Sequence, residues 1–432
     1  MGGNFDGTEG IGLYAASNLS GGAPAVLIDN ATLTAAGGNI NIYGKCASSY
    51  DDGIRLQAVI TTTGSGTVGL YGDAHGGYNG TQFFGGITFI TNSSTIETDA
   101  GNINIEATLT NTQSNGTYAL NFYRTAYTTG TSNRHIQLLS KSGNIQVTGD
   151  RGSTAAGGMG SSSWGDIYVG SPLDASWTAT GNITFSYSSF VGAGYNGIIA
   201  KTTGGVTYEP VSTSFEAAQT FPYNTNYILA DGASSLTIGK AGNSANITMN
   251  SAQTVAGPIS IYGGYVNING NLTSSATGDI FIKGIAGTNP SIWVQSGKTI
   301  TKSGGTGTLT MQGHGRVLHQ GSITTSGTGV LNVIFWSDFD NDNDDGGVSQ
   351  FGTISTNGGH VWLGGSNSNG GSYTWNGLTV GDGPSIGSTG FNGNAMDIYG
   401  NITTNGGDFL AWAGSAAGSS IAGIANDGSG DI

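Results

Sequence analysis

A short phrase recurs along this chain: an apolar residue, Thr or Ser, small residues, Gly, and then apolar residues that alternate with polar ones. It reads LTAAGGNINI from Leu33 and IETDAGNINI from Ile96. Copies at Trp177 and Ile199 begin 22 residues apart. Self-similarity at such a period is the mark of a repeat architecture, in which each unit buries its apolar face only by stacking on its neighbours. Strand-type alternation without a helical phrase predicts one coil of a β-solenoid per copy.

The strand of each coil begins directly after the glycine. In GNINI, which starts at Gly38 and again at Gly101, the two isoleucines lie on one face of a strand and Asn lies on the other. The Gly or Gly-Gly before the strand is expected to supply a corner with positive φ, and the Thr or Ser just before it is expected on the outer face of the preceding strand. The predicted inward set is Ile40, Ile42, Ile103, Ile105, Ile145, Val147, Ile183, Phe185, Ile259, Ile261, Ile280 and Ile282.

These patterns predict an all-β chain that forms a parallel β-helix (β-solenoid) of roughly 16–20 rungs, at the repeat length of such folds. Residues 1–432 are expected to form a single elongated domain, with a break in the rhythm near 208–227. Gly430–Ile432 opens another copy of the phrase, which suggests a fragment of a longer array. Lateral loop insertions are expected at Asp73–Phe84, Tyr123–Asn133, Arg151–Trp164, Tyr208–Tyr227 and Asn367–Phe391.

Composition excludes several classes of function. Only 9% of the residues are charged and the net charge is −14, from 12 Lys and Arg against 26 Asp and Glu. A nucleic-acid binder needs clustered cations, and an anionic membrane surface repels an acidic chain, so neither partner is expected. No apolar run approaches the ~20 residues of a membrane span. One cysteine, Cys46, rules out an internal disulfide framework and suits a protein that works outside the cell.

Tyrosine recurs directly after the repeated strand, in the tripeptide apolar–Tyr–Gly. Alternation points each of these tyrosines outward, where copies from neighbouring coils can stack. Two interpretations remain open: an aromatic ladder that binds sugars, or packing that stiffens a corner of the coil. The residues concerned are Tyr43, Tyr71, Tyr262 and Tyr399.

Catalytic signals are sparse. Glycoside hydrolysis needs carboxylates that converge ~5–9.5 Å apart on one face, whereas most acids here are dispersed along the repeats. The best candidate is the pair Asp51 and Asp52 with Arg55, for which the alternative is a solvated turn. The five histidines form no close metal-binding pair. They are His75, His135, His314, His319 and His360.

The segment Asp338–Gly347 carries the only dense charge. Its many hard oxygens are the ligand type that Ca²⁺ prefers, and they make it the candidate metal site; no other cofactor is expected. Gly352 occupies the position where an EF-hand-like loop needs a bidentate Glu, so the choice is between an irregular Ca²⁺ loop and a solvated acidic turn. The candidate ligands are Asp338, Asp340, Asp342, Asp344 and Asp345.

The repeated G-N-I-x-I and I-T-T-x-G-G phrases resemble the filamentous haemagglutinin-like β-helix of giant bacterial surface proteins. The stretch Phe335–Gly365 is similar to segments of very large repeat-rich surface proteins of Bacteroidetes-type bacteria. The resemblance implies a right-handed parallel β-helix, secretion across the outer membrane, and a role as an adhesin stalk or surface fibre. The secretion-signal domain that begins such proteins is not part of this sequence.

The leading hypothesis is therefore a non-enzymatic structural shaft of an extracellular adhesin or filament at the bacterial cell surface. Two alternatives remain: a carbohydrate-active β-helix of the lyase or glycosidase type, and a self-assembling surface fibre, because uncapped ends expose strand edges. The expected partners are surface glycans, other cells or further copies of the chain.

Overall fold

The computed structural model describes residues 10–17, 23–47, 51–75, 77–78, 83–90, 94–110, 118–123, 135–151, 157–161, 166–192, 197–223, 227–287, 290–341, 346–387, 394–414 and 424–425. Strands are the only regular elements among them, which confirms the all-β prediction. The chain divides into two compact units: Met1–Glu216 with Tyr223–Ala233, and Ala217–Pro222 with Ser234–Ile432. The divisions fall in or beside the predicted rhythm break near 208–227.

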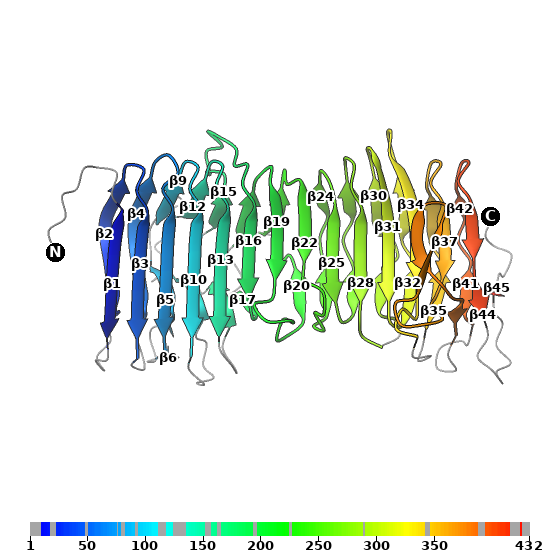
Figure 1. Ribbon diagram of the computed structural model, residues 1–432, viewed down its shortest axis with the longest axis horizontal. Coiled ribbons are helices and arrows are strands. Elements are labelled where there is room, and N and C mark those ends of the chain that lie inside the picture. Colours follow the sequence, from blue (N-terminus) through cyan, green and yellow to red (C-terminus); the bar gives the residue numbers. More distant parts are fainter. Residues whose placement is uncertain are drawn as a thin grey trace. The chain divides into compact units, whose positions relative to one another are not determined.

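Both units are parallel β-solenoids, as predicted, with successive coils side by side (Figure 1). In unit 1 the first sheet takes one strand from each coil: β1 (Ile11–Ser17), β3 (Ile40–Cys46), β5 (Val68–Ala74), β10 (Ile103–Leu109), β13 (Ile145–Arg151), β16 (Ile183–Tyr187) and β19 (Gly205–Glu209).

The second sheet of unit 1 branches at β4 (Ile54–Thr62), which pairs with β2 (Val26–Ala35) on one side and with both β8 (Ile87–Ile90) and β9 (Thr95–Thr98) on the other. One branch continues through β11 (Tyr118–Tyr123), β14 (Gly157–Ser161) and β17 (Phe190–Gly192), and the other through β12 (Ile136–Ser140), β15 (Ile167–Gly170), β18 (Ile198–Lys201) and β21 (Ile228–Asp231). A small antiparallel pair, β6 (Gly77–Tyr78) and β7 (Phe83–Phe84), lies in the insertion predicted at 73–84.

Unit 2 has three long parallel sheets and a short parallel pair, β40 (Ser385–Ile386) with β44 (Ala413–Gly414). Its first sheet consists of β22 (Ser235–Ile238), β25 (Ile259–Gly263), β28 (Ile280–Gly284), β31 (Thr306–Gly313), β34 (Val330–Trp336), β37 (Val361–Gly364) and β43 (Phe409–Ala411). The second consists of β20 (Gln219–Phe221), β23 (Ile247–Met249), β26 (Val266–Ile268), β29 (Ile292–Val294), β32 (Arg316–His319), β35 (Gly347–Gln350), β41 (Met396–Ile398) and β45 (Ile424–Ala425). The third consists of β24 (Gln253–Val255), β27 (Leu272–Ser274), β30 (Thr299–Lys302), β33 (Ser322–Thr325), β36 (Thr353–Ser355) and β42 (Ile402–Thr403).

The described residues supply fourteen first-sheet strands, seven in each unit, fewer than the 16–20 rungs expected. Insertions lengthen several coils, which lowers the number of coils formed by the described part of the chain. Equivalent positions are 42 residues apart from Asn102 to Asn144 and 48 apart from His360 to Asp408, against 23 from Asn182 to Gly205.

An aliphatic core fills each coil. All twelve residues of the predicted inward set are at most 2% exposed. They stack in register from coil to coil, as Ile103 does on Ile145 and Ile145 on Ile183. The predicted alternation of the repeated strand is therefore correct.

Glycine stands before these strands for two reasons, one of them expected. At Gly101 and Gly143 an added Cβ would lie 1.8–2.0 Å from the carbonyl oxygen of the equivalent glycine one coil earlier, so the close approach of the backbones excludes any side chain. The expected positive φ is found at the first glycine of several Gly-Gly pairs, as at Gly37 (φ 89°) and Gly358 (φ 95°), and at the single Gly278 (φ 150°).

One Thr or Ser at these corners faces the interior, contrary to the expected outward position, whereas the Thr one residue earlier in the phrase is exposed, as expected, at Thr34 and Thr403. Thr98, Ser140 and Thr202 are completely buried. The Thr98 hydroxyl donates to the Gly101 carbonyl (2.6 Å), and the Ser140 hydroxyl donates to the same oxygen (3.0 Å) while accepting from the Gly143 N–H (2.9 Å). The hydroxyls thus satisfy backbone groups that the tight corner leaves without ladder partners.

Asparagine after the glycine joins one coil to the next. The Oδ1 atoms of Asn102, Asn144 and Asn182 accept hydrogen bonds from the backbone N–H of the equivalent residue in the following coil, at 2.8–2.9 Å. Unit 2 repeats this contact with Asn246, Asn271 and Asn332 and with Asp279. We call this series the Asn ladder.

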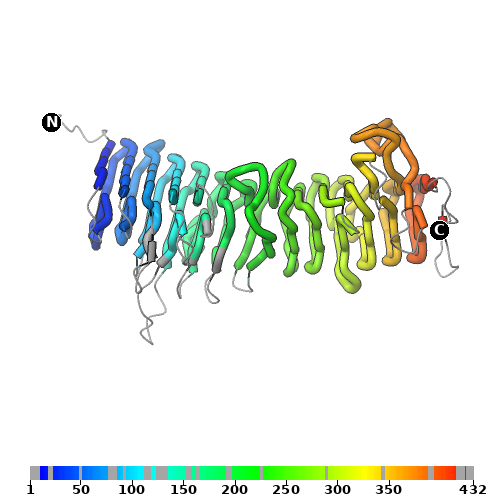
Figure 2. Tube along the Cα trace, turned by 90° about the horizontal axis from the view of Figure 1, so that it is seen from below, coloured from blue at the N-terminus to red at the C-terminus, as the bar shows by residue number. Residues whose placement is uncertain are grey.

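An inserted hairpin covers part of the first sheet of unit 2. Strands β38 (Ser372–Trp375) and β39 (Leu378–Gly381) pair antiparallel within the insertion predicted at 367–391, and Figure 2 shows this segment, in orange, standing out from the coils. Beneath it the strand faces that usually point to water are apolar. The resulting outer aromatic cluster has Ile334, Trp336, Trp362 and Val380 at its centre and Phe339, Tyr373, Trp375, Leu378 and Leu410 around them.

The strand register can be tested by substitution. Ile103→Asp or Ile280→Asp should lower the free energy of unfolding by several kcal/mol, because each change buries an unpaired charge in the apolar core. Asn104→Asp, one position away on the outer face of β10, should have almost no effect. Urea unfolding followed by circular dichroism measures both, and a larger loss for Asn104→Asp would contradict the register.

The Asn ladder makes a second prediction. Asn144→Ala should lower the free energy of unfolding by about 1 kcal/mol, the usual worth of one hydrogen bond. Asn144→Asp keeps the accepting oxygen, as Asp279 does in its own coil, and should stay close to the wild type. Equal losses in both variants, measured by the same denaturation, would show that Oδ1 does not join the coils.

Candidate functional site

The acidic segment after β34 is only partly described, and its described carboxylates face protein groups. Asp338 is buried in a turn with φ 50°. The Oδ2 atom of Asp340 lies 2.9 Å from Nδ1 of His314. Among the residues that the structure describes, no group of three His, Cys, Asp or Glu could hold a metal ion. Asp342, Asp344 and Asp345 lie outside the described residues, so the Ca²⁺ loop stays a prediction.

Phe339 anchors this segment to unit 2. Its ring packs on Trp336, at 5.2 Å between centroids, and stacks with His314 at 5.9 Å. The ammonium group of Lys283 lies 4.1 Å from the centre of the ring, a cation–π contact. The described start of the acidic segment is therefore fixed against the outer aromatic cluster, and the idea of a wholly solvated turn does not hold for Asp338–Asp340.

The catalytic candidate near the start of the chain is a buried ion pair. Asp52 is fully buried and accepts hydrogen bonds from Arg55 Nε (2.7 Å), the Gly85 N–H (2.7 Å) and the Thr88 hydroxyl (2.6 Å). Burial raises the pKa of Asp52, and these three partners counteract the rise. Asp51 is buried beside it. The candidate residues do lie together, and the bonds of Asp52 join neighbouring segments of the second sheet, with Asp51 and Asp52 buried and Arg55 partly exposed.

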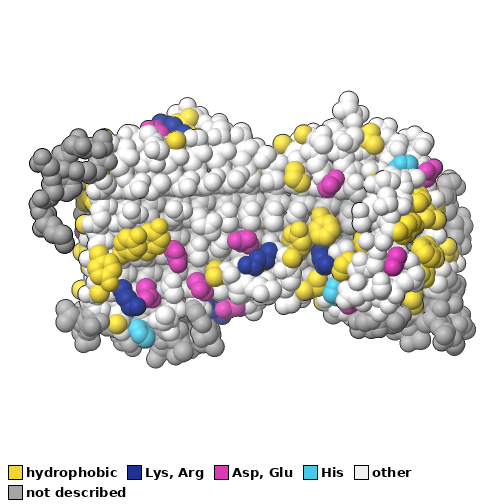
Figure 3. All heavy atoms as spheres, in the orientation of Figure 1, with side chains coloured by type: hydrophobic (Ala, Val, Ile, Leu, Met, Phe, Trp, Pro, Cys, Tyr) yellow, Lys and Arg dark blue, Asp and Glu magenta, His cyan; other side chains and the backbone are white. Residues whose placement is uncertain are grey.

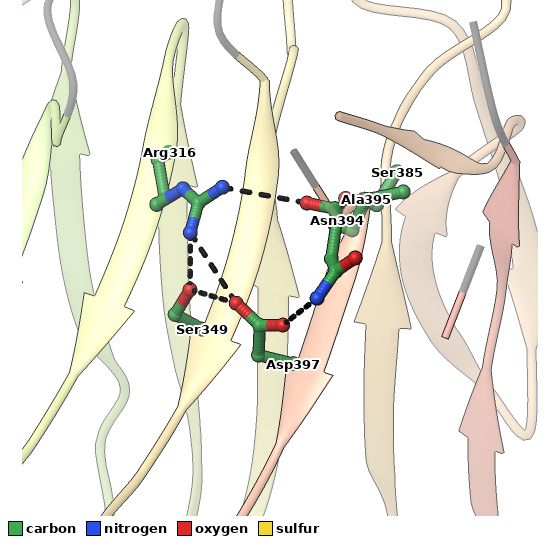
Figure 4. A network of polar contacts seen from close by, with 6 residues as sticks. All are labelled: Arg316, Ser349, Ser385, Asn394, Ala395 and Asp397. Carbon is green, nitrogen blue, oxygen red and sulfur yellow. Dashed lines mark hydrogen bonds and ion pairs between the residues drawn. The ribbon is translucent and has the colours of Figure 1, made fainter. Parts of the chain in front are cut away.

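A second buried network lies in unit 2, and no sequence pattern indicated it. Arg316, on β32, reaches over β35 and donates from Nη1 to the Ser349 hydroxyl (2.6 Å) and to Asp397 Oδ2 (3.4 Å) (Figure 4). Ser349 also donates to Asp397 Oδ2 (3.1 Å), and Asn394 donates to Oδ1 (2.8 Å). Leu318, Ser349 and Asp397 occupy one register position in successive coils. The proximity of Ser349 to Asp397 could have been predicted only if the residues at which each coil begins and ends had been known.

This network contains residue types that occur in catalytic sites, but its side chains are buried and connect neighbouring coils. Arg316, Ser349 and Asp397 are each at most 4% exposed. Breaking a buried ion pair leaves an uncompensated charge, which typically costs 3–5 kcal/mol. The arrangement therefore links three coils of the second sheet of unit 2.

The histidines have separate roles and do not converge. His360 belongs to the Asn ladder: its N–H donates to Asn332 Oδ1, and its Nδ1 accepts from the Asp408 N–H (2.9 Å). His135 packs edge-on against Tyr168. His319 lies in the core of unit 2, in register with Val294 on one side and Gln350 on the other. Neither ring nitrogen of His319 has a hydrogen-bond partner among the residues that the structure describes.

The exposed feature with binding geometry is the tyrosine column of unit 1. Tyr14, Tyr43 and Tyr71 occupy one register position on β1, β3 and β5. The rings of Tyr43 and Tyr71 stack, with centroids 4.6 Å apart and planes 10° apart, which confirms the predicted stacking for this pair. Figure 3 shows hydrophobic side chains gathered over these strands beside basic and acidic ones.

A shallow groove of about 230 Å³ follows this column. One side is formed by the three tyrosines, and the other includes Lys45 and Asp73, an exposed ion pair at 3.1 Å. Burial, with contributions from Tyr43 and Glu106, raises the pKa of Tyr71, so its hydroxyl stays protonated and able to donate at neutral pH. The groove is open to water and combines aromatic surface with donors and acceptors.

Comparison of the chain with protein-family models, curated proteins and solved structures found no match. No helix among the described residues is long and apolar enough to cross a membrane.

The buried histidine makes stability depend on pH. Desolvation lowers the pKa of His319 from 6.5 to about 3. The unfolded chain takes up a proton below pH 6.5 that the folded chain refuses, so His319 should reduce stability progressively as the pH falls from 6.5 toward 3. His319→Leu should flatten this fall between pH 7 and pH 5, measured by urea unfolding at each pH. An unchanged slope in the variant would contradict the assignment.

Proposed function

We propose that this chain is a non-enzymatic structural shaft of an extracellular adhesin or cell-surface filament. The observation that supports this most is the unbroken repetition of one coil-to-coil joint within each unit. Every joint combines parallel backbone pairing, a column of buried aliphatic side chains and, at most coils, an Asn or Asp contact. Each further joint of this kind adds one coil to the solenoid, so the number of repeats in the sequence sets the length of the structure.

Side-chain networks support the same proposal. The polar groups that look most like catalytic residues are Asp52 with Arg55 and Arg316 with Asp397. Asp52, Arg316 and Asp397 are buried and Arg55 is partly buried, and both networks bridge neighbouring coils, the first through the bonds of Asp52 to Gly85 and Thr88. Removing either network would weaken coil stacking, whereas a catalytic pair must reach a substrate. Cys46 is also buried, which protects the one thiol from oxidation in an extracellular setting.

Pulling the chain from its two ends in optical tweezers tests the mechanical part of this proposal. Because a coil contacts only its neighbours, extension should proceed through successive force steps that each release one or a few coils. The variant Arg316→Met should lower the force of the steps in unit 2 and leave those of unit 1 unchanged. A single all-or-none event for each unit would contradict a shaft built from repeated joints.

Location and the enzymatic alternative are tested separately. Antibodies raised against the chain should label intact cells of its source without permeabilisation, and labelling only after permeabilisation would overturn the extracellular assignment. Incubation with neutral and acidic polysaccharides should release neither reducing ends nor unsaturated products. Release of either that is abolished by Asp52→Asn would support a carbohydrate-active β-helix instead.

A further inference from the structure

The groove beside the tyrosine column has a defined construction. Tyr14, Tyr43 and Tyr71 stand at one outward register position, and Lys45, Asp73 and Thr108 stand at the next outward position. Gly44 and Gly72 lie between the two rows, so backbone forms the floor. Glu106, in register with Tyr71, continues the first row on β10. The groove therefore crosses successive strands and runs along the direction in which coils stack.

The fold itself does not require these aromatic side chains. At the same register position the following strands of unit 1 carry Glu106, Thr148, Ser186 and Glu209. The strands pair equally well around those polar residues. Three tyrosines on consecutive coils are thus an addition to the repeat, and Tyr14 is left 78% exposed and Tyr43 42% exposed. Large aromatic surface held in water marks an interaction site.

The chemistry of the lining selects an amphipathic, uncharged ligand. The tyrosine rings offer apolar surface, and the tyrosine hydroxyls, the Lys45 ammonium and the carboxylates of Asp73 and Glu106 offer donors and acceptors. A sugar ring matches both, because it presents C–H groups on its faces and hydroxyls around its edge. Two acids face one base in the groove, and the whole chain has a net charge of −14, so an anionic polymer would be repelled.

Geometry restricts the ligand further. Strands of neighbouring coils are about 4.8 Å apart, close to the length of one ring in an extended β-linked glycan. Such a glycan can follow a straight groove and place about one ring against each coil, whereas an α-linked glycan that curves would leave the groove. The volume of about 230 Å³ is below the ~300–1,000 Å³ of pockets that enclose a small molecule, which suits a chain lying on the surface.

We propose that this groove binds a neutral, extended β-linked oligosaccharide along the stacking direction of unit 1. The inference deepens the proposed function, on which it rests: a shaft of an adhesin would itself contact surface glycans. Binding at so shallow a site is weak for one copy and gains strength when many copies meet a glycan-coated surface.

Calorimetric titration of the purified chain tests this directly. The probes are β-1,4-linked hexasaccharides of glucose, mannose and xylose, with maltohexaose and polygalacturonate as the curved and anionic comparisons. At least one β-linked hexasaccharide should bind, with maltohexaose and polygalacturonate each at least tenfold weaker. The variant Tyr43→Ala/Tyr71→Ala should lose at least tenfold in affinity.

Unit 2 provides a matched control. Phe351 and Tyr399 form another stacked pair, with centroids 4.9 Å apart and planes 3° apart, and Phe351 is exposed. Phe351→Ala/Tyr399→Ala should bind the β-linked probe as the wild type does, and circular dichroism should show both double variants folded. No binding of any β-linked probe, tighter binding of polygalacturonate, or equal losses in the two variants would overturn the inference. The pulling and surface-labelling experiments do not depend on the groove, so their results separate its failure from that of the shaft.

Discussion

Successive coils of each unit must meet in register, and most of the sequence serves that constraint. The period of a strand is two residues, so a slip of one position would carry Ile103 and Ile105 to the surface and Asn104 into the core. The aliphatic columns penalise such a slip, and the Gly-Asn corner fixes the position at which each strand starts. Corner glycines such as Gly101 and Gly143 admit no side chain, and the asparagine at the next position accepts a hydrogen bond from its own equivalent in the following coil.

The same constraint explains why polar groups are buried in an otherwise aliphatic solenoid. Corners interrupt the backbone ladder, and the interior hydroxyls of Thr98, Ser140 and Thr202 supply the missing donors. At the corresponding place in unit 2, Lys302 is buried and its ammonium donates to Ser274 Oγ (2.8 Å) and the Gly278 carbonyl (2.7 Å). Burial lowers the pKa of Lys302, while Asp279 acts in the opposite direction. Each such group is tolerated because its hydrogen bonds are made within the corner.

Sequence patterns predicted the repeated strand and its inward face well. Alternate residues of a strand face opposite sides, so in a stacked coil the apolar residues of the alternation must face the core. The patterns did not predict the inward Thr and Ser or the Asn ladder, although Asn or Asp stands directly before many of the strands. The run VLNVIFW at β34 carried a further signal: apolar residues on both faces indicate a strand covered on both sides, as the hairpin β38–β39 covers Ile334 and Trp336. Pairing such as Arg316 with Asp397, 81 residues apart, depends on the lengths of inserted segments and lies beyond local pattern.

The Asn ladder also bears on how such a protein ages. Asparagine is among the residues most prone to slow chemical damage, through hydrolysis of its carboxamide to a carboxylate. Each rung of the ladder uses the carbonyl oxygen Oδ1 as the acceptor toward the next coil, and that oxygen survives the hydrolysis. Asp279 already occupies an equivalent position and makes the same contact at 2.8 Å. A coil-to-coil joint built on an acceptor oxygen therefore tolerates hydrolysis of the asparagine carboxamide, provided the backbone is not rearranged.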